Sequence, residues 1–189
     1  MNLGFIIWLI PPLIYYLVQK KEIGKRKSLQ NLGIKKCSWI YYVLGIGLGI
    51  GGILISKLIV SFGNINSDLL LHTPGSLGDL PKTFISFTII FVLIGIPVGF
   101  SEELLFRGLL GGIFMRKWKF WWGNSLQAVI FAIFHTLPVL LVTPDTSIFA
   151  FAFSFISGFI MGVLYHNSGS IIPSFLMHSL GYPLLLWIF

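Results

Sequence analysis

Six apolar stretches alternate with short polar or basic connections along the chain. A helix that crosses the hydrocarbon core of a bilayer needs about 20 mostly apolar residues. The expected segments are Leu3 to Val18, Trp39 to Phe62, Phe84 to Met115, Phe120 to Val142, Ile148 to Tyr165 and Ser170 to Phe189. The pattern predicts an all-α, polytopic transmembrane helical bundle of about six helices.

Composition agrees with a membrane protein. Of the 189 residues, 56% are hydrophobic and 10% are charged, whereas an average soluble domain has roughly 25% charged residues. The mean hydropathy is +0.90. Short connections leave no room for a separate soluble domain, so residues 1–189 are expected to form a single integral-membrane domain.

The net charge of +7 comes from bases gathered in two connections, residues 20–36 and 116–119. No RNA- or DNA-binding motif accompanies these bases, so nucleic acid is not an expected partner. The positive-inside rule instead predicts that both connections face the cytoplasm of a multi-pass cell-membrane protein. The turn-rich stretch 63–82 and the short loop 143–147 would then face outward.

The second apolar segment carries a run of small residues, Gly45, Gly47, Gly49, Gly51 and Gly52. Small side chains allow a neighbouring membrane helix to approach closely. We expect this face to pack against another helix.

Three charged residues interrupt the third segment, within "GFSEELLFRG" at residues 99–108. Each costs several kcal/mol in a bilayer, and such residues usually face a cavity or one another. Glu103 and Arg107 are four residues apart, a spacing that lets a carboxylate and a guanidinium pair on one helix face. Glu102 is rotated by about 100° from Glu103. Glu102 is therefore expected to have no basic partner on its own helix, and an unpaired carboxylate suits the role of a general base.

Two histidines in apolar segments are candidate partners for Glu102. His135 follows Lys119 by 16 residues and Glu102 precedes Arg116 by 14 residues, roughly 24 Å and 21 Å along helices that start from one connection. Glu102 and His135 can therefore lie level, and His178 lies in "PSFLMHSLGY". The trio matches either a water-activating acid/base set or a His2Glu metal site. His72 and His166 are expected to lie outside the site.

The sequence offers no convincing Ser/His/Asp or Cys/His grouping for nucleophilic catalysis. Ser179 follows His178 directly, but adjacent residues on a helix do not face each other. The single Cys37 lies beside the basic connection. An activated water is the remaining nucleophile.

Three stretches together resemble a known family. "EELLFRG" at 102–108, "FAIFH" at 131–135 and "GSIIPSFLMHSLGY" at 169–182 are similar to the three motifs of the CPBP (CAAX protease and bacteriocin-processing, or Abi) intramembrane proteases. This family is related to the type II CAAX prenyl endopeptidase. The motifs occur in family order and cover roughly residues 95–182, inside a motif-bearing region of about 84–189.

The resemblance implies a membrane enzyme in which Glu102 activates water, His135 shares that water and His178 stabilises the oxyanion. Glu103, Arg107 and Phe131 would support these residues. The third motif of the family normally reads His-x-x-x-Asn, but Tyr182 occupies the fourth position after His178. A tyrosine hydroxyl can donate a hydrogen bond, but from a different place than a carboxamide.

Three hypotheses follow. The first is an endopeptidase that cleaves near the C-terminus or leader of a membrane-associated or lipidated peptide. It would use either no cofactor or a divalent metal such as zinc on Glu102, His135 and His178. The second is a non-catalytic membrane protein that confers bacteriocin immunity or scaffolds a peptide exporter. The third, a small transporter, lacks the expected internal repeat.

Overall fold

The computed structural model describes residues 5–62, 80–142 and 144–188. All regular structure in these ranges is helical, which confirms the predicted all-α bundle. Its elements are α1 (Phe5–Ile23), α2 (Lys25–Asn31), α3 (Trp39–Phe62), α4 (Phe84–Ile90), η2 (Phe91–Gly95), α5 (Ile96–Glu103), η3 (Leu104–Gly111), α6 (Gly112–Lys117), α7 (Phe120–Val142), η4 (Pro144–Thr146), α8 (Ser147–Ser168) and α9 (Ile172–Ile188).

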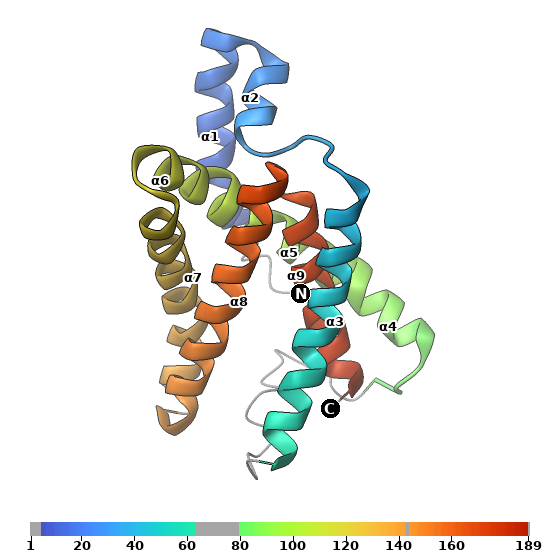
Figure 1. Ribbon diagram of the computed structural model, residues 1–189. Helices are drawn as coiled ribbons and strands as arrows, with labels where there is room; N and C mark the ends of the chain where they lie inside the picture. Colours follow the sequence, from blue (N-terminus) through green and yellow to red (C-terminus); the bar gives the residue numbers. More distant parts are fainter. Residues whose placement is uncertain (1–4, 63–79, 143, 189) are drawn as a thin grey trace.

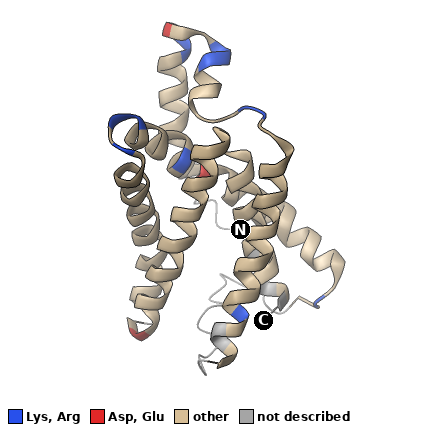
Figure 2. Ribbon diagram, in the orientation of Figure 1, with Lys and Arg blue, Asp and Glu red and all other residues tan. Residues whose placement is uncertain are grey.

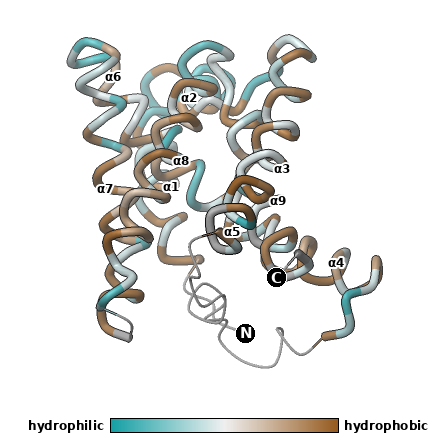
Figure 3. Tube along the Cα trace, turned by 60° about the horizontal axis from the view of Figure 1, so that its bottom comes forward, coloured by the Kyte–Doolittle hydropathy of each residue, from teal (hydrophilic) through white to brown (hydrophobic). Residues whose placement is uncertain are grey.

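The long helices form two packed pairs, α7 with α8 and α3 with α9 (Figure 1). Helix α5 and the π-helix η3 run between these pairs, and α4 projects to one side. The helix bodies are mostly hydrophobic, while hydrophilic residues gather at the end of the bundle where α2 and α6 lie (Figure 3). Large apolar side chains cover the outer surface, for example Leu141 at 78% exposed and Phe84 at 79%. A bilayer can solvate such a surface, so the chain is a multi-pass membrane protein.

Four helical stretches among the described residues are long and apolar enough to cross a bilayer: Trp39–Leu58, Phe84–Lys117, Phe120–Leu141 and Pro144–Ser168. The predicted count of about six is therefore not confirmed. Helix α1 ends in the charged residues Lys20, Lys21 and Glu22, and α9 has 17 residues.

The basic connection at residues 20–36 was expected to be a loop, and this expectation was wrong. Helix α1 continues to Ile23, and α2 forms a second short helix that packs against it. Gly24, with φ of +82°, makes the break between them, since this left-handed conformation favours glycine. The Ser28 hydroxyl donates to the Gly24 carbonyl at 2.8 Å and fixes the turn. The outward loop predicted at 63–82 lies outside the described residues as far as residue 79.

Glycines set the closest helix contacts. A Cβ at Gly45 of α3 would clash with the Pro173 backbone of α9, and one at Gly49 would lie 2.9 Å from the Met177 carbonyl oxygen. The expected close approach of the glycine face is therefore confirmed at these two positions. Gly99 of α5 packs on Ser179 in the same way, since its Cβ would lie 3.2 Å from that residue. This contact brings the end of α5 beside α9.

Candidate functional site

The intramembrane charges lie where α5 passes into η3. Glu103 closes α5, and Arg107 lies four residues later in η3. Arg107 Nη1 donates to Glu103 Oε1 at 2.7 Å, and both side chains are completely buried, so the predicted pair is confirmed. Arg107 Nη2 also donates to the Gly158 carbonyl of α8 at 3.2 Å. The pair thus joins η3 to α8. In Figure 2, a Lys or Arg segment and an Asp or Glu segment lie close together within the bundle, away from the charges at its ends.

The change from α-helix to π-helix falls directly after Glu103. The sequence predicted a long helix here and did not predict its π-helical turns. π-Helical segments use i→i+5 hydrogen bonds and occur often at functional sites. In this chain, η3 holds Arg107 inside the bundle, and Phe106 of η3 is also completely buried.

His135 reaches the site from α7. Its Nε2 lies 3.2 Å from Glu102 Oε2, which confirms that Glu102 and His135 lie level. Its Nδ1 lies 2.9 Å from the Phe131 carbonyl oxygen. Because a carbonyl only accepts hydrogen bonds, Nδ1 carries a proton, and Nε2 is the ring nitrogen that faces the Glu102 carboxylate.

His178 reaches the same point from α9. Its Nδ1 lies 3.0 Å from Glu103 Oε1, and its Nε2 lies 3.6 Å from Glu102 Oε2. The Glu103 carboxylate thus binds Arg107 and His178 through one oxygen. Glu103 fixes the ring of His178 and directs Nε2 toward Glu102.

Exposure divides the five residues into two layers. The side chains of Glu102, His135 and His178 are 10%, 32% and 18% exposed, whereas those of Glu103 and Arg107 are completely buried. The two histidines are therefore partly accessible, whereas the Glu102 Oε2 atom between them is buried. Of the completely buried pair, Glu103 binds His178 directly.

Phe131 packs in the middle of the cluster. The Arg107 guanidinium carbon lies 4.4 Å from its ring centroid, and the His135 ring centroid lies 4.0 Å away. An edge-to-face contact joins Phe131 to Phe106 with 5.1 Å between centroids. Phe131 therefore separates the charged pair from the surface of the bundle.

Two buried amides were missed by sequence reasoning. Gln127 Nε2 donates to the Gly158 carbonyl at 3.0 Å, the same oxygen that Arg107 binds, and to Asn124 Oδ1 at 2.9 Å. Asn124 donates in turn to the Phe159 carbonyl at 3.1 Å. The sequence did contain a signal for these contacts. Asn124 and Gln127 lie in an apolar segment, and polar residues in membrane helices usually bind one another.

Among the remaining candidates, His166 and Ser179 make contacts outside the charged cluster. His166 stacks on Phe120 with ring centroids 4.2 Å apart, at the far end of α8. Ser179 is buried, and its hydroxyl donates to the Leu176 carbonyl within α9. Tyr182 belongs to α9, one turn after His178, but its side chain lies outside the described residues. His72 lies outside them entirely.

Glu102, His135 and His178 also form a possible cation site. One ligand atom from each lies within 4.8 Å of the others. A carboxylate and two imidazoles are a donor set that zinc accepts, and both imidazoles have the Nδ1 partner typical of metal-bound histidine. The residues therefore fit a divalent metal as well as a water held by the same atoms.

The comparison with known families agrees with this geometry. The model of the family described as Type II CAAX prenyl endopeptidase Rce1-like matches residues 84–181. That range contains all five residues of the charged cluster and ends just before Tyr182. No curated protein and no solved structure matches the chain. The family match covers more than half of the chain, which therefore belongs to the Rce1-like type II CAAX prenyl endopeptidase family of membrane proteases.

Proposed function

We propose that this chain is an intramembrane endopeptidase that hydrolyses a bond near the C-terminus or leader of a membrane-associated or lipidated peptide. The observation that supports it best is the convergence of Glu102, His135 and His178, two of them partly exposed, beside the buried Glu103–Arg107 pair. The family supports protease activity generally. The type of peptide and the roles of the residues are part of the proposal.

In the proposed reaction, a water lies beside Glu102 Oε2 and His135 Nε2, which are 3.2 Å apart, and donates one hydrogen bond to each. The Glu102 carboxylate takes a proton as the water oxygen attacks the peptide carbonyl, and the protonated Glu102 later passes this proton to the leaving amine. Since Phe131 holds the Nδ1 proton of His135, the Nε2 lone pair is available to orient the water. The hydroxyl of Ser179 plays no part, since it binds within its own helix.

His178 would stabilise the negative oxygen of the tetrahedral intermediate. For this it must carry a proton on Nε2, so the ring acts as an imidazolium whose Nδ1–H binds Glu103. The charges then balance: the two carboxylates carry two negative charges, while Arg107 and the imidazolium carry two positive charges. The low-dielectric interior favours this arrangement, because the net charge of the four groups is zero.

A divalent metal such as zinc is the alternative activator, held by Glu102, His135 and His178. When bound, such an ion would polarise the peptide carbonyl and make its water acidic near neutral pH. Glu103 and Phe131 would keep their roles, since they fix the tautomers of His178 and His135. We favour the metal-independent reaction.

The test uses protein purified in detergent and a mixed library of lipidated and unlipidated peptides. Wild type is compared with Glu102→Gln, which keeps the shape of the side chain, with and without a chelator. The proposal expects new peptide termini from wild type and none from a folded Glu102→Gln protein. Activity that survives the chelator supports a carboxylate-activated water, and loss with recovery on adding zinc supports the metal. Equal cleavage by both proteins would contradict the proposal.

A second candidate function rests on Tyr182, which stands where the family has asparagine. A protein that lacks the carboxamide donor at this position could confer bacteriocin immunity, or scaffold a peptide exporter, without cleaving anything. In that case Glu102→Gln would still protect cells against the bacteriocin. Loss of protection in a folded Glu102→Gln protein would count against this function.

A further inference from the structure

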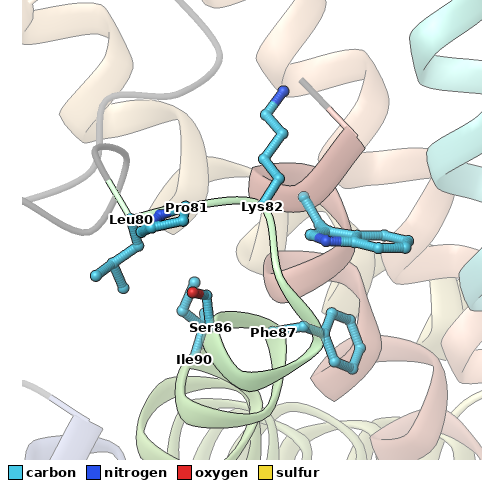
Figure 4. A pocket seen from close by; sticks show the side chains of 7 residues that line it. Leu80, Pro81, Lys82, Ser86, Phe87 and Ile90 are labelled. Atoms are coloured by element: carbon cyan, nitrogen blue, oxygen red, sulfur yellow. The ribbon is translucent and has the colours of Figure 1, made fainter.

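A pocket of about 430 Å³ opens between α2 and the segment that leads to α3. Its lining residues are Arg26, Leu29, Gln30, Ile34, Lys35 and Lys36. The hollow at the start of α4 is much smaller: Figure 4 shows it beside Ser86 and Ile90, and its volume of about 10 Å³ holds at most one water. The larger pocket has room for a ligand, and it lies apart from the cluster around Glu102.

Hydrogen bonds attach the wall of this pocket to the turn between α8 and α9. The Ser170 hydroxyl donates to the Lys35 carbonyl at 2.6 Å, and the Ile171 N–H donates to the Gly33 carbonyl at 3.0 Å. Gly33 has φ of +74°, and a Cβ there would lie 2.7 Å from the Tyr165 ring. Leu32 is 2% exposed. The cations are thus carried on a fixed backbone.

Within the described part of the chain, the basic residues of the pocket form no ion pair. Arg26, Lys35 and Lys36 line the pocket, and the ion pairs found among the described residues join groups of the intramembrane cluster. Glu22, the acidic residue of this connection, forms no ion pair with any of the three. An anion would therefore bind here without displacing a carboxylate.

The position of the pocket relative to the membrane favours a lipid as the bound anion. Trp39 begins a candidate membrane span three residues after Lys36, and its side chain is 70% exposed. Exposed tryptophans mark the level of the lipid headgroups. Leu29 and Ile34 add apolar surface beside the cations. Figure 2 shows these bases and those near α6 at the same end of the bundle.

We propose that this pocket binds the phosphate headgroup of an anionic phospholipid, with Arg26, Lys35 and Lys36 as the phosphate contacts. Basic pockets beside membrane helices are known to hold such headgroups. The bound lipid would contact the α2–α3 segment, whose Leu32 carbonyl packs against Gly108 of η3. This proposal does not rest on peptidase activity.

Native mass spectrometry of the detergent-solubilised chain tests the proposal, with phosphatidylglycerol and phosphatidylcholine of equal chain length. The pocket variant carries Arg26→Gln, Lys35→Gln and Lys36→Gln. The control carries Lys21→Gln, Lys25→Gln and Lys27→Gln, which removes the same charge from exposed residues of the same connection.

Wild type is expected to prefer phosphatidylglycerol. The pocket variant should lose on the order of 100-fold in affinity, since each basic side chain contributes about fivefold near an anionic headgroup. The control should stay within about threefold of wild type, because more distant charges are screened. A Lys35→Arg, Lys36→Arg variant should keep binding, which shows that the fold is intact.

Three results would overturn the proposal. One is equal affinity for the two lipids, and another is an equal loss in the pocket and control variants, which would indicate diffuse surface charge. The third is complete displacement of the lipid by excess inorganic phosphate, which would indicate a site for free anions. The Glu102→Gln protein should bind lipid as wild type does, so failure of the proposed peptidase function leaves this test unaffected.

Discussion

Glu102 and Glu103 are adjacent in sequence, but only Glu103 is completely buried and paired with Arg107. Substitution of each residue should therefore affect stability differently. Glu103→Gln removes the carboxylate that binds Arg107 and His178 and leaves a buried guanidinium without its counter-ion. Such a loss destabilises by about 3–5 kcal/mol. We therefore expect thermal unfolding in detergent at a clearly lower temperature for Glu103→Gln than for Glu102→Gln. Equal melting of the two variants would show that the pair does not hold η3 in place.

Tyr182 gives a second prediction at the residue scale. Tyr182→Asn introduces the residue that the motif resemblance implies one turn after His178. If a carboxamide there donates to the oxyanion, the rate of peptide cleavage should rise, since one such donor is worth about 10²–10³ in turnover. The measurement is the cleavage rate of the best library peptide. An unchanged or lower rate would mean that Tyr182 suits the reaction of this chain.

The sequence predicted the charged cluster well because helical spacing alone decides much of it. The four-residue step from Glu103 to Arg107 and the similar depth of Glu102 and His135 follow from helix geometry. The carbonyl of Phe131 that sets the tautomer of His135 could not be predicted, because backbone contacts depend on how helices pack. The hydrogen bonds of Gln127 and Asn124 could not be predicted either, because each amide binds a backbone carbonyl of α8.

At the scale of the element, α3 and α9 are held together by glycine contacts that differ within one face. A Cβ at Gly45 would meet the backbone of Pro173, whereas one at Gly47 would meet nothing within 4 Å. Gly45→Ala should therefore destabilise by about 1–3 kcal/mol through overpacking, while Gly47→Ala should be neutral. Detergent-solubilised variants compared by thermal unfolding provide the check. An equal effect of both changes would contradict this packing.

The elements also show where sequence patterns stop being sufficient. Apolar runs predicted the long helices, but α2 was missed because its basic residues were interpreted only as a topology signal. The π-helical turns of η2 and η3 leave no trace in hydropathy. Helix α9 has 17 residues, so its length does not decide whether it crosses the bilayer.

Orientation is a property of the whole molecule. The two basic connections lie at one end of the bundle (Figure 2), and the positive-inside rule predicts that this end faces the cytoplasm. Cys37, the single cysteine, adjoins this end, so a membrane-impermeant maleimide should not label it in intact cells. Asp145→Cys in a Cys37→Ser background should be labelled. The reverse pattern would mean that the chain is inverted.

The most direct measurement is a double-mutant cycle on the cleavage rate of one defined peptide, using wild type, Glu102→Gln, His135→Asn and the double variant. A water shared by both residues predicts that Glu102→Gln lowers the rate by about 10²–10⁴, and that the double variant is about as slow as the slower single variant. A Glu102→Gln protein within about tenfold of wild type, or two effects that multiply, would contradict a water activated jointly by Glu102 and His135.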